Sequence, residues 1–163
     1  MTGATADARS GRALAGTPAR QPAWLRWGSL VVCVLGLAAS AYLTFEHYSS
    51  STSLACPDTG AINCLKVTTS SYSELLGLPV ALLGLLFYVG MTALCSPPAW
   101  SASNPWVGRV RLLGAVSGVV LVVYLVWAEL FRIDAICLWC TAVHVLTVVL
   151  FGLLVVGAAL QEA

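Results

Sequence analysis

The stretch that decides the fold is ICLWCTAVHVLTVVLFGLLVVGAAL, at residues 136–160. It contains no Asp, Glu, Lys or Arg, and it is longer than the roughly 20 apolar residues that a helix needs to cross a bilayer. It opens with Cys137-Leu138-Trp139-Cys140, a CxxC motif. The stretch therefore predicts a transmembrane helix with a pair of thiols at its beginning.

Three further apolar runs precede this one, at residues 27–45, 75–95 and 112–128. Hydrophobic residues make up 59% of the 163-residue chain and charged residues only 9%, against about a quarter in a soluble domain. Such a chain has too few polar side chains to cover a soluble fold. The sequence therefore predicts an all-α membrane protein, built as a four-transmembrane-helix bundle.

One membrane domain, residues 24–163, accounts for most of the chain. Residues 1–23 are rich in Ala, Gly, Thr and Arg without apolar periodicity, so we expect a disordered cytoplasmic tail. The motif Ala39-Ser40-Ala41 resembles a signal-peptide cleavage site, but hydrophobicity continues to Phe45, which favours a retained anchor. The net charge of +1 and the lack of a basic cluster exclude nucleic acid as a partner.

Basic residues predict the orientation in the membrane. Six of the eight Lys and Arg residues lie on one side of the predicted bundle: Arg9, Arg12, Arg20, Arg26, Arg109 and Arg111. Only Lys66 and Arg132 lie on the other side. Because cytoplasmic loops carry the excess of positive charge, we expect both termini in the cytoplasm and residues 49–78 and 131–136 outside.

The outer segment at residues 49–78 is long for a connector, and long loops in compact proteins are usually functional or disordered. Ser71-Tyr72-Ser73-Glu74 fits a capping box, and Gly77 and Pro79 follow as helix stop signals. We therefore expect a short helix in this loop, which folds back over the bundle.

The predicted topology sorts the six cysteines into two groups. Cys33 and Cys95 fall in the first helix and at the inner end of the second, where we expect structural thiols. The other four fall on the outer side, where disulfides form and persist: Cys56, Cys64, Cys137 and Cys140. These four are the predicted catalytic residues of a thiol oxidoreductase.

The two outer pairs differ in their surroundings. Cys137 and Cys140 open a helix, whose free N–H groups and dipole stabilise a thiolate, and Asp134 is the expected N-cap. Cys56 and Cys64 bracket a polar, turn-prone segment, so we expect a mobile pair that meets protein thiols while the fixed pair reaches a lipid-soluble acceptor. Two structural disulfides or a four-thiolate zinc site are the alternatives. Zinc sites favour short knuckles, and the seven-residue gap departs from them, so we expect no metal.

The remaining notable residues have simple structural interpretations. Gly114 and Gly118 have the spacing that lets membrane helices approach closely. Glu46, Glu129 and Asp134 lie at outer helix ends, where we expect solvated or capping groups rather than proton carriers.

The order of the cysteines and the residues between them resemble the vitamin K epoxide reductase family, specifically its bacterial members. The matching segments are CLKVTTSSYS at residues 64–73 and GLPVALLGLLFY at residues 77–88. The resemblance implies a four-helix bundle around a quinone, menaquinone or ubiquinone, that accepts electrons. It implies that Cys140 lies nearest the quinone, that Cys137 exchanges disulfides with Cys64, and that Cys56 meets the partner.

The partner implied by the resemblance is a secreted or membrane-anchored thioredoxin-like oxidant, which forms disulfides in exported proteins. Some bacterial relatives carry a fused thioredoxin domain, whereas this chain ends at Ala163, so we expect a separate partner protein. The implied quinone-binding residues are Ser70, Val80, Ala81, Gly84, Tyr88 and His144.

Two positions depart from the animal members of the family, which carry an asparagine at the position of Val80 and a tyrosine at that of His144. These departures argue against epoxide reduction. Reduction of a quinone or its epoxide is nevertheless the first alternative function, and a membrane scaffold held by structural disulfides is the second.

Overall fold

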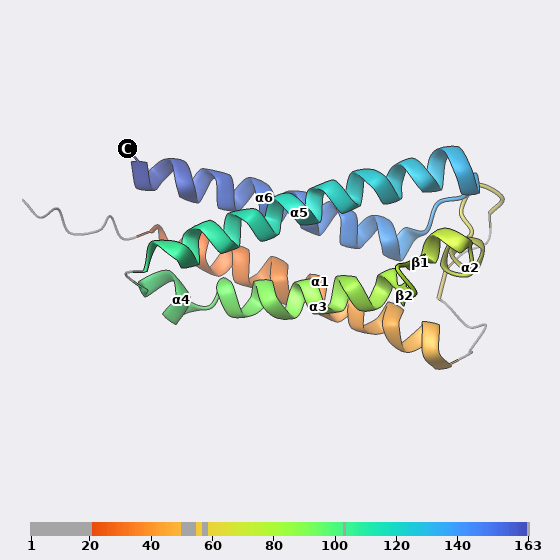
Figure 1. The fold of residues 1–163 in the computed structure, drawn as a ribbon, viewed down its shortest axis with the longest axis horizontal. Helices are drawn as coiled ribbons and strands as arrows, with labels where there is room; N and C mark the ends of the chain where they lie inside the picture. The colour runs from red at the N-terminus through yellow and green to blue at the C-terminus, as the bar shows by residue number, and fades with distance from the viewer. Residues whose placement is uncertain (1–20, 50–54, 57–58, 103, 163) are drawn as a thin grey trace, which may run out of the picture.

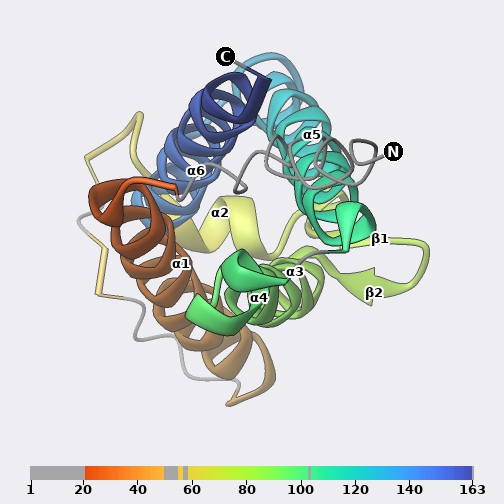
Figure 2. The same cartoon turned by 90° about the vertical axis from the view of Figure 1, so that its left-hand side faces the viewer.

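The computed structural model describes residues 21–49, 55–56, 59–102 and 104–162. Four helices run lengthwise beside one another: α1 (Ala23–Ser49), α3 (Val80–Leu94), α5 (Pro105–Ala128) and α6 (Leu138–Glu162) (Figure 1). Seen end-on, they enclose a common centre, with α1 beside α3 and α6, and α5 closing the ring (Figure 2). The all-α membrane fold is confirmed. Most of the predicted tail at residues 1–23 lies outside the described residues.

Helix α3 is shorter than the other three helices. Among the described residues, α1, α6 and α5 with its continuation to Ile133 are long and apolar enough to cross a membrane. Helix α3 has only 15 residues, which corresponds to about 22 Å of helix against the roughly 30 Å of a hydrocarbon core. The expected start of this helix, at residue 75, is therefore wrong by five residues.

A β-hairpin replaces the expected first turn of the second helix. Strand β1 (Glu74–Leu75) pairs antiparallel with β2 (Leu78–Pro79), and Leu76 and Gly77 between them have φ angles of 56° and 78°. Two central residues with positive φ form the kind of tight turn that suits the twist of a hairpin. Gly77 adopts this conformation easily, and Pro79 then fixes the backbone just before Val80 starts the helix.

The short helix of the outer loop lies earlier than the capping-box pattern predicts. It is α2 (Cys64–Thr68), capped by the side chain of Asn63, which accepts a hydrogen bond from the N–H of Lys66 at 2.8 Å. The predicted capping box forms only a 3₁₀ turn, η2 (Ser71–Ser73), because the Ser73 hydroxyl donates to the carbonyl of Ser70 at 2.7 Å. Such local side-chain bonds compete with helix formation.

The two ends of the bundle carry different elements. The beginning of α1 and the end of α6 lie together at one end, where Gln21 Nε2 donates to the carbonyl of Gly157 at 3.1 Å. Helix α4 (Pro97–Ser101) lies at the same end. At the opposite end lie α2, the hairpin and the connection between α5 and α6 (Figure 1). The structure thus brings the two segments predicted to lie outside to one end.

The predicted close packing around Gly118 is present. A Cβ atom at this position would lie 2.8 Å from Cζ of Phe87 and 3.0 Å from Cγ2 of Thr147, so a larger residue would push α5 away from α3 and α6. Gly36 of α1 likewise allows Tyr88 to pack closely, because the tyrosine ring occupies the space that a Cβ atom would need. Tyr88 is fully buried, in a cluster with Cys33, and its hydroxyl is paired with Thr147.

Candidate active site

The four predicted catalytic cysteines gather at the end of the bundle that carries α2. Cys56 and Cys64 form a disulfide, and Cys137 and Cys140 are free thiols. No disulfide in the described part of the chain joins the loop to the bundle. Cys64 is 2% exposed, whereas Cys56 is partly exposed.

A backbone contact places Cys64 next to Cys137. Ile62 and Ile136 form a parallel bridge, in which the N–H of Asn63 donates to the carbonyl of Ile136 at 3.1 Å and the N–H of Ile136 donates to the carbonyl of Ala61 at 2.9 Å. Each cysteine follows this bridge closely along its own chain segment. Both are buried in one apolar cluster with Val67, Ile133 and Ala135, and Cys56 and Cys140 pack against it. The two pairs therefore meet through Cys64 and Cys137.

The sulfur of Cys137 caps helix α6. The N–H of Cys140 donates to this sulfur at 3.2 Å, in the position that an N-cap side chain occupies. Asp134, the expected cap, instead adopts a left-handed conformation and ends the π-helical turn η3 (Glu129–Ile133). Hydrogen bonds from the Cys140 thiol, and then from backbone N–H groups of Cys140 and Trp139, lower the pKa of Cys137 despite its burial. Cys137 is thus prepared for thiol–disulfide exchange.

Further hydrogen bonds hold the outer loop over the bundle. Arg132 Nε donates to the hydroxyl of Tyr72 at 2.7 Å, and Lys66 Nζ donates to the carbonyl of Asp134 at 3.2 Å. On the other side, the indole N–H of Trp139 donates to the carbonyl of Ala55 at 3.1 Å. These bonds fix the loop on both sides of the two cysteine pairs.

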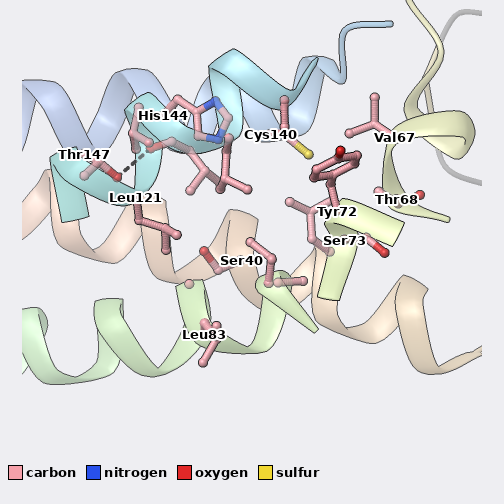
Figure 3. Close-up of a pocket in the computed structure, with 18 of the residues that line it drawn as sticks. Ser40, Val67, Thr68, Tyr72, Ser73, Leu83, Leu121, Cys140, His144 and Thr147 are labelled. Carbon is pink, nitrogen blue, oxygen red and sulfur yellow. Dashed lines mark hydrogen bonds between the residues drawn. The ribbon is translucent and has the colours of Figure 1, made fainter. Parts of the chain in front are cut away.

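Beneath the loop lies a cavity of about 380 Å³ among the four helices. All six predicted quinone-binding residues line it: Ser70, Val80, Ala81, Gly84, Tyr88 and His144. The Cys140 side chain projects into it, near Tyr72 (Figure 3). The structure thus brings the second cysteine of the CxxC motif and the predicted pocket residues to one cavity, whereas Cys137 is not among its lining residues and packs with Cys64.

Few polar groups face the apolar walls of the cavity. The hydroxyl of Ser40 is buried, has no hydrogen-bond partner and points into the space (Figure 3). His144 is 7% exposed and lines the same wall as Cys140. The hydroxyl of Tyr88 is engaged by Thr147 at 2.9 Å and by the carbonyl of Val143 at 3.2 Å. Among the described residues that line the cavity, Ser40 therefore presents a buried hydroxyl without a protein partner.

Sequence reasoning missed several lining residues. Glu129 was expected to be a solvated or capping group, and it is not solvated, because it is 6% exposed and lines the cavity. Ser40 and Tyr72 were not singled out as binding residues. A signal for Ser40 does exist, because Ser40, Leu43 and His47 follow helical spacing on one face of α1, and all three line the cavity.

These features define a class of protein. In this membrane bundle a loop disulfide adjoins a dithiol, and the dithiol opens on an apolar cavity. These are the features of a membrane thiol oxidoreductase with a lipid-soluble acceptor. A model of the vitamin K epoxide reductase family matches residues 27–155, and the chain belongs to this family. The family uses quinone, so the protein is a quinone-linked thiol oxidoreductase of the membrane.

The cavity residues fit a quinone. Quinone rings are flat and apolar with two carbonyl oxygens, and binding pockets of this kind combine apolar walls with a few placed polar groups. Here the small residues Ala81 and Gly84 leave room for a ring, and the unpartnered hydroxyl of Ser40 is available to a carbonyl oxygen. Cys140 supplies the sulfur at one wall.

Proposed function

We propose that this protein reoxidises a thioredoxin-like disulfide oxidant and thereby drives disulfide formation in exported proteins. The observation that carries the proposal is the contact between the two cysteine pairs, in which Cys64 and Cys137 share one buried cluster while Cys140 faces the cavity. Electrons would pass from the partner to Cys56–Cys64, then to Cys137–Cys140, and finally to quinone.

The first exchange takes place at the loop disulfide. A thiolate of the partner attacks the sulfur of Cys56, the Cys56–Cys64 bond breaks, and its electron pair leaves on Cys64. The second thiol of the partner then displaces Cys56, which leaves the partner oxidised and both loop cysteines reduced. Cys56 suits this role because it is more exposed than the buried Cys64.

The second exchange transfers the electrons to the membrane helix. Once Cys137 and Cys140 are oxidised to a disulfide, the Cys64 thiolate attacks Cys137, and the electron pair leaves on Cys140. Cys56 then attacks Cys64, which restores the loop disulfide and leaves Cys137 and Cys140 reduced. The quinone, when bound, accepts two electrons and two protons from this pair. An oxidised quinone pool favours this direction, since about 30 mV is worth about 1.4 kcal/mol for a two-electron couple.

The proposed location is a bacterial cytoplasmic membrane, with both termini in the cytoplasm and the four cysteines on the extracytoplasmic side. The distribution of basic residues supports this orientation. The proposed partner is a secreted or membrane-anchored protein with a thioredoxin-like pair of thiols, and the proposed quinone contacts are Ser70, Val80, Ala81, Gly84, Tyr88 and His144.

Removing the last sulfur tests the relay. A Cys140→Ala variant should lose quinone reduction by a dithiol-reduced partner, measured as quinol formation in detergent or liposomes. Cys95→Ala is the matched control, because it removes a buried thiol outside the cavity and should keep the activity. Full quinone reduction by Cys140→Ala would disprove the proposal.

Trapping experiments distinguish the proposal from its alternatives. Cys64→Ser should accumulate a mixed disulfide between Cys56 and the partner, and a double variant lacking Cys56 and Cys140 should link Cys64 to Cys137. Cysteines that stay oxidised whatever the partner or quinone would indicate a scaffold. A product assay with quinone epoxide distinguishes an epoxide reductase, which should consume the epoxide at a rate comparable to quinone.

A further inference from the structure

Glu129 is a buried carboxylate at the outer end of helix α5. It begins the π-helical turn η3, and its carbonyl accepts the N–H of Ala135 at 3.3 Å, which ties the turn to the segment before Cys137. Its side chain lines the cavity and is 6% exposed. π-Helical turns inside α-helices are frequent at functional sites.

The surroundings of this carboxylate do not give it a structural role that would account for its burial. Burying a carboxylate is costly, and ionisable residues within membrane segments are functional candidates for that reason. No Lys or Arg is among the described residues that line the cavity beside it. The interaction that stabilises its charge is a hydrogen bond from the backbone N–H of Cys137.

Glu129 lines the cavity together with Cys140. Its backbone carbonyl is bonded to the N–H of Ala135, two residues before Cys137, so the carboxylate lies near the atoms that lose protons when a disulfide forms. It also borders the space proposed for the quinone, whose oxygens gain protons when it is reduced. A carboxylate in this position can accept a proton from one side and donate it on the other.

We propose that Glu129 is the proton shuttle of quinone reduction, an inference that rests on the proposed function. Two S–H bonds break, one S–S bond forms between Cys137 and Cys140, and two electrons and two protons pass to the quinone. When Cys137 ionises, Glu129 takes its proton and later delivers it to one quinone oxygen. The proton of the Cys140 thiol passes to the other quinone oxygen as the S–S bond forms. The carboxyl is therefore unchanged after each turnover, so no further oxidant or acid is needed.

Other titratable groups around the cavity are less suited to this task. His144 lies one turn further along α6 than Cys140, His47 belongs to the end of α1, and the hydroxyl of Tyr72 accepts a hydrogen bond from Arg132. Asp134 is exposed and outside the cavity lining. Among these groups, Glu129 combines a bond to Cys137 with a position on the cavity wall.

The test compares Glu129→Gln with Glu74→Gln. Glutamine keeps an acceptor for the N–H of Cys137 but cannot carry the proton, and Glu74 is an exposed carboxylate at the same end of the molecule. In a single turnover with prereduced protein, Glu129→Gln should form quinol about 100-fold more slowly, a typical loss for general acid–base catalysis. Glu74→Gln should match the wild type.

Two quinone-free measurements complete the experiment. Exchange from the loop dithiol to the Cys137–Cys140 disulfide should proceed within about threefold of the wild-type rate in Glu129→Gln, since this step does not need the shuttle. Redox-induced infrared difference spectra should show a carboxyl band in wild type and Glu74→Gln that is absent from Glu129→Gln.

Three outcomes would overturn the shuttle. The first is an unchanged rate of quinol formation in Glu129→Gln. The second is an equal loss of disulfide exchange and of quinol formation in that variant, which indicates a structural role. The third is a wild-type infrared spectrum without the carboxyl band. None of them affects the relay itself, which instead fails if Cys140→Ala reduces quinone normally.

Discussion

The backbone N–H of Cys140 donates to the sulfur of Cys137 across 3.2 Å. A reactive sulfur thereby takes the place of the serine or aspartate that usually caps a helix. The local geometry of the CxxC motif thus makes its first cysteine the better thiolate and leaves its second cysteine facing the cavity. This division of work is consistent with a relay in which Cys137 receives electrons and Cys140 passes them on.

The first prediction concerns the ionisation of Cys137. Because hydrogen bonds to its sulfur lower its pKa, the thiolate should persist at pH values where ordinary thiols are protonated, and should disappear only as the pH falls through the lowered value. Thiolate absorbance in the ultraviolet, followed in a Cys56→Ser/Cys64→Ser background, measures this. The thiolate absorbance that remains at low pH should vanish in Cys137→Ser and persist in Cys95→Ser. Titration at the usual thiol pKa would contradict the capping role.

The second prediction concerns the bridge that holds the two pairs together. Ile136→Pro removes the N–H that donates to the carbonyl of Ala61 at 2.9 Å, so Cys64 should dock less well against Cys137. We expect exchange between the two pairs to slow at least tenfold, corresponding to about 1.4 kcal/mol, while prereduced Cys137 and Cys140 still reduce quinone. Ile136→Val keeps the hydrogen bond and should exchange normally. Equal exchange rates in both variants would show that the bridge is dispensable.

The third prediction concerns the hydroxyl of Ser40. Since it is buried without a partner, Ser40→Ala should leave the stability of the quinone-free protein unchanged or raise it. The KM for quinone should rise about threefold to tenfold, as expected for one lost hydrogen bond. Ser29→Ala on the same helix is the control, because its buried hydroxyl already donates to the carbonyl of Arg26 at 3.0 Å. Ser29→Ala should lose stability while its KM for quinone stays constant. If Ser40→Ala also lost stability at a constant KM, Ser40 would not be a quinone contact.

The fourth prediction concerns the close approach of helices at Gly118. An alanine there would overlap Phe87 and Thr147, so Gly118→Ala should lower the free energy of unfolding by about 1–3 kcal/mol, as overpacking usually does. Gly152→Ala adds the same methyl group where no atom lies within 4 Å and should be neutral or stabilising. Thermal unfolding in one detergent compares the two. If Gly118→Ala lowered the free energy of unfolding less than Gly152→Ala does, the helices would not be tightly packed at Gly118.

Some features of the site follow from short stretches of sequence and others do not. The apolar runs and the cysteine spacing lie within single segments, so the bundle and the four cysteines could be predicted from them. The start of α3 was misplaced because residues 75–79 are apolar but contain a turn at Leu76 and Gly77. Asp134 was misassigned because its conformation depends on the π-helical turn before it.

The sequence by itself determined a four-helix membrane protein with two cysteine pairs, because hydrophobic run length and residue type report directly on the solvent around each segment. Only the tertiary structure decided that Cys64 lies against Cys137 and that Glu129 is buried beside them. The first fact depends on the backbone bridge between Ile62 and Ile136, two residues far apart in the chain, and the second depends on how the helices enclose the cavity. Hydrogen bonds between such distant segments form only when the whole bundle folds, and no local pattern of residues encodes them.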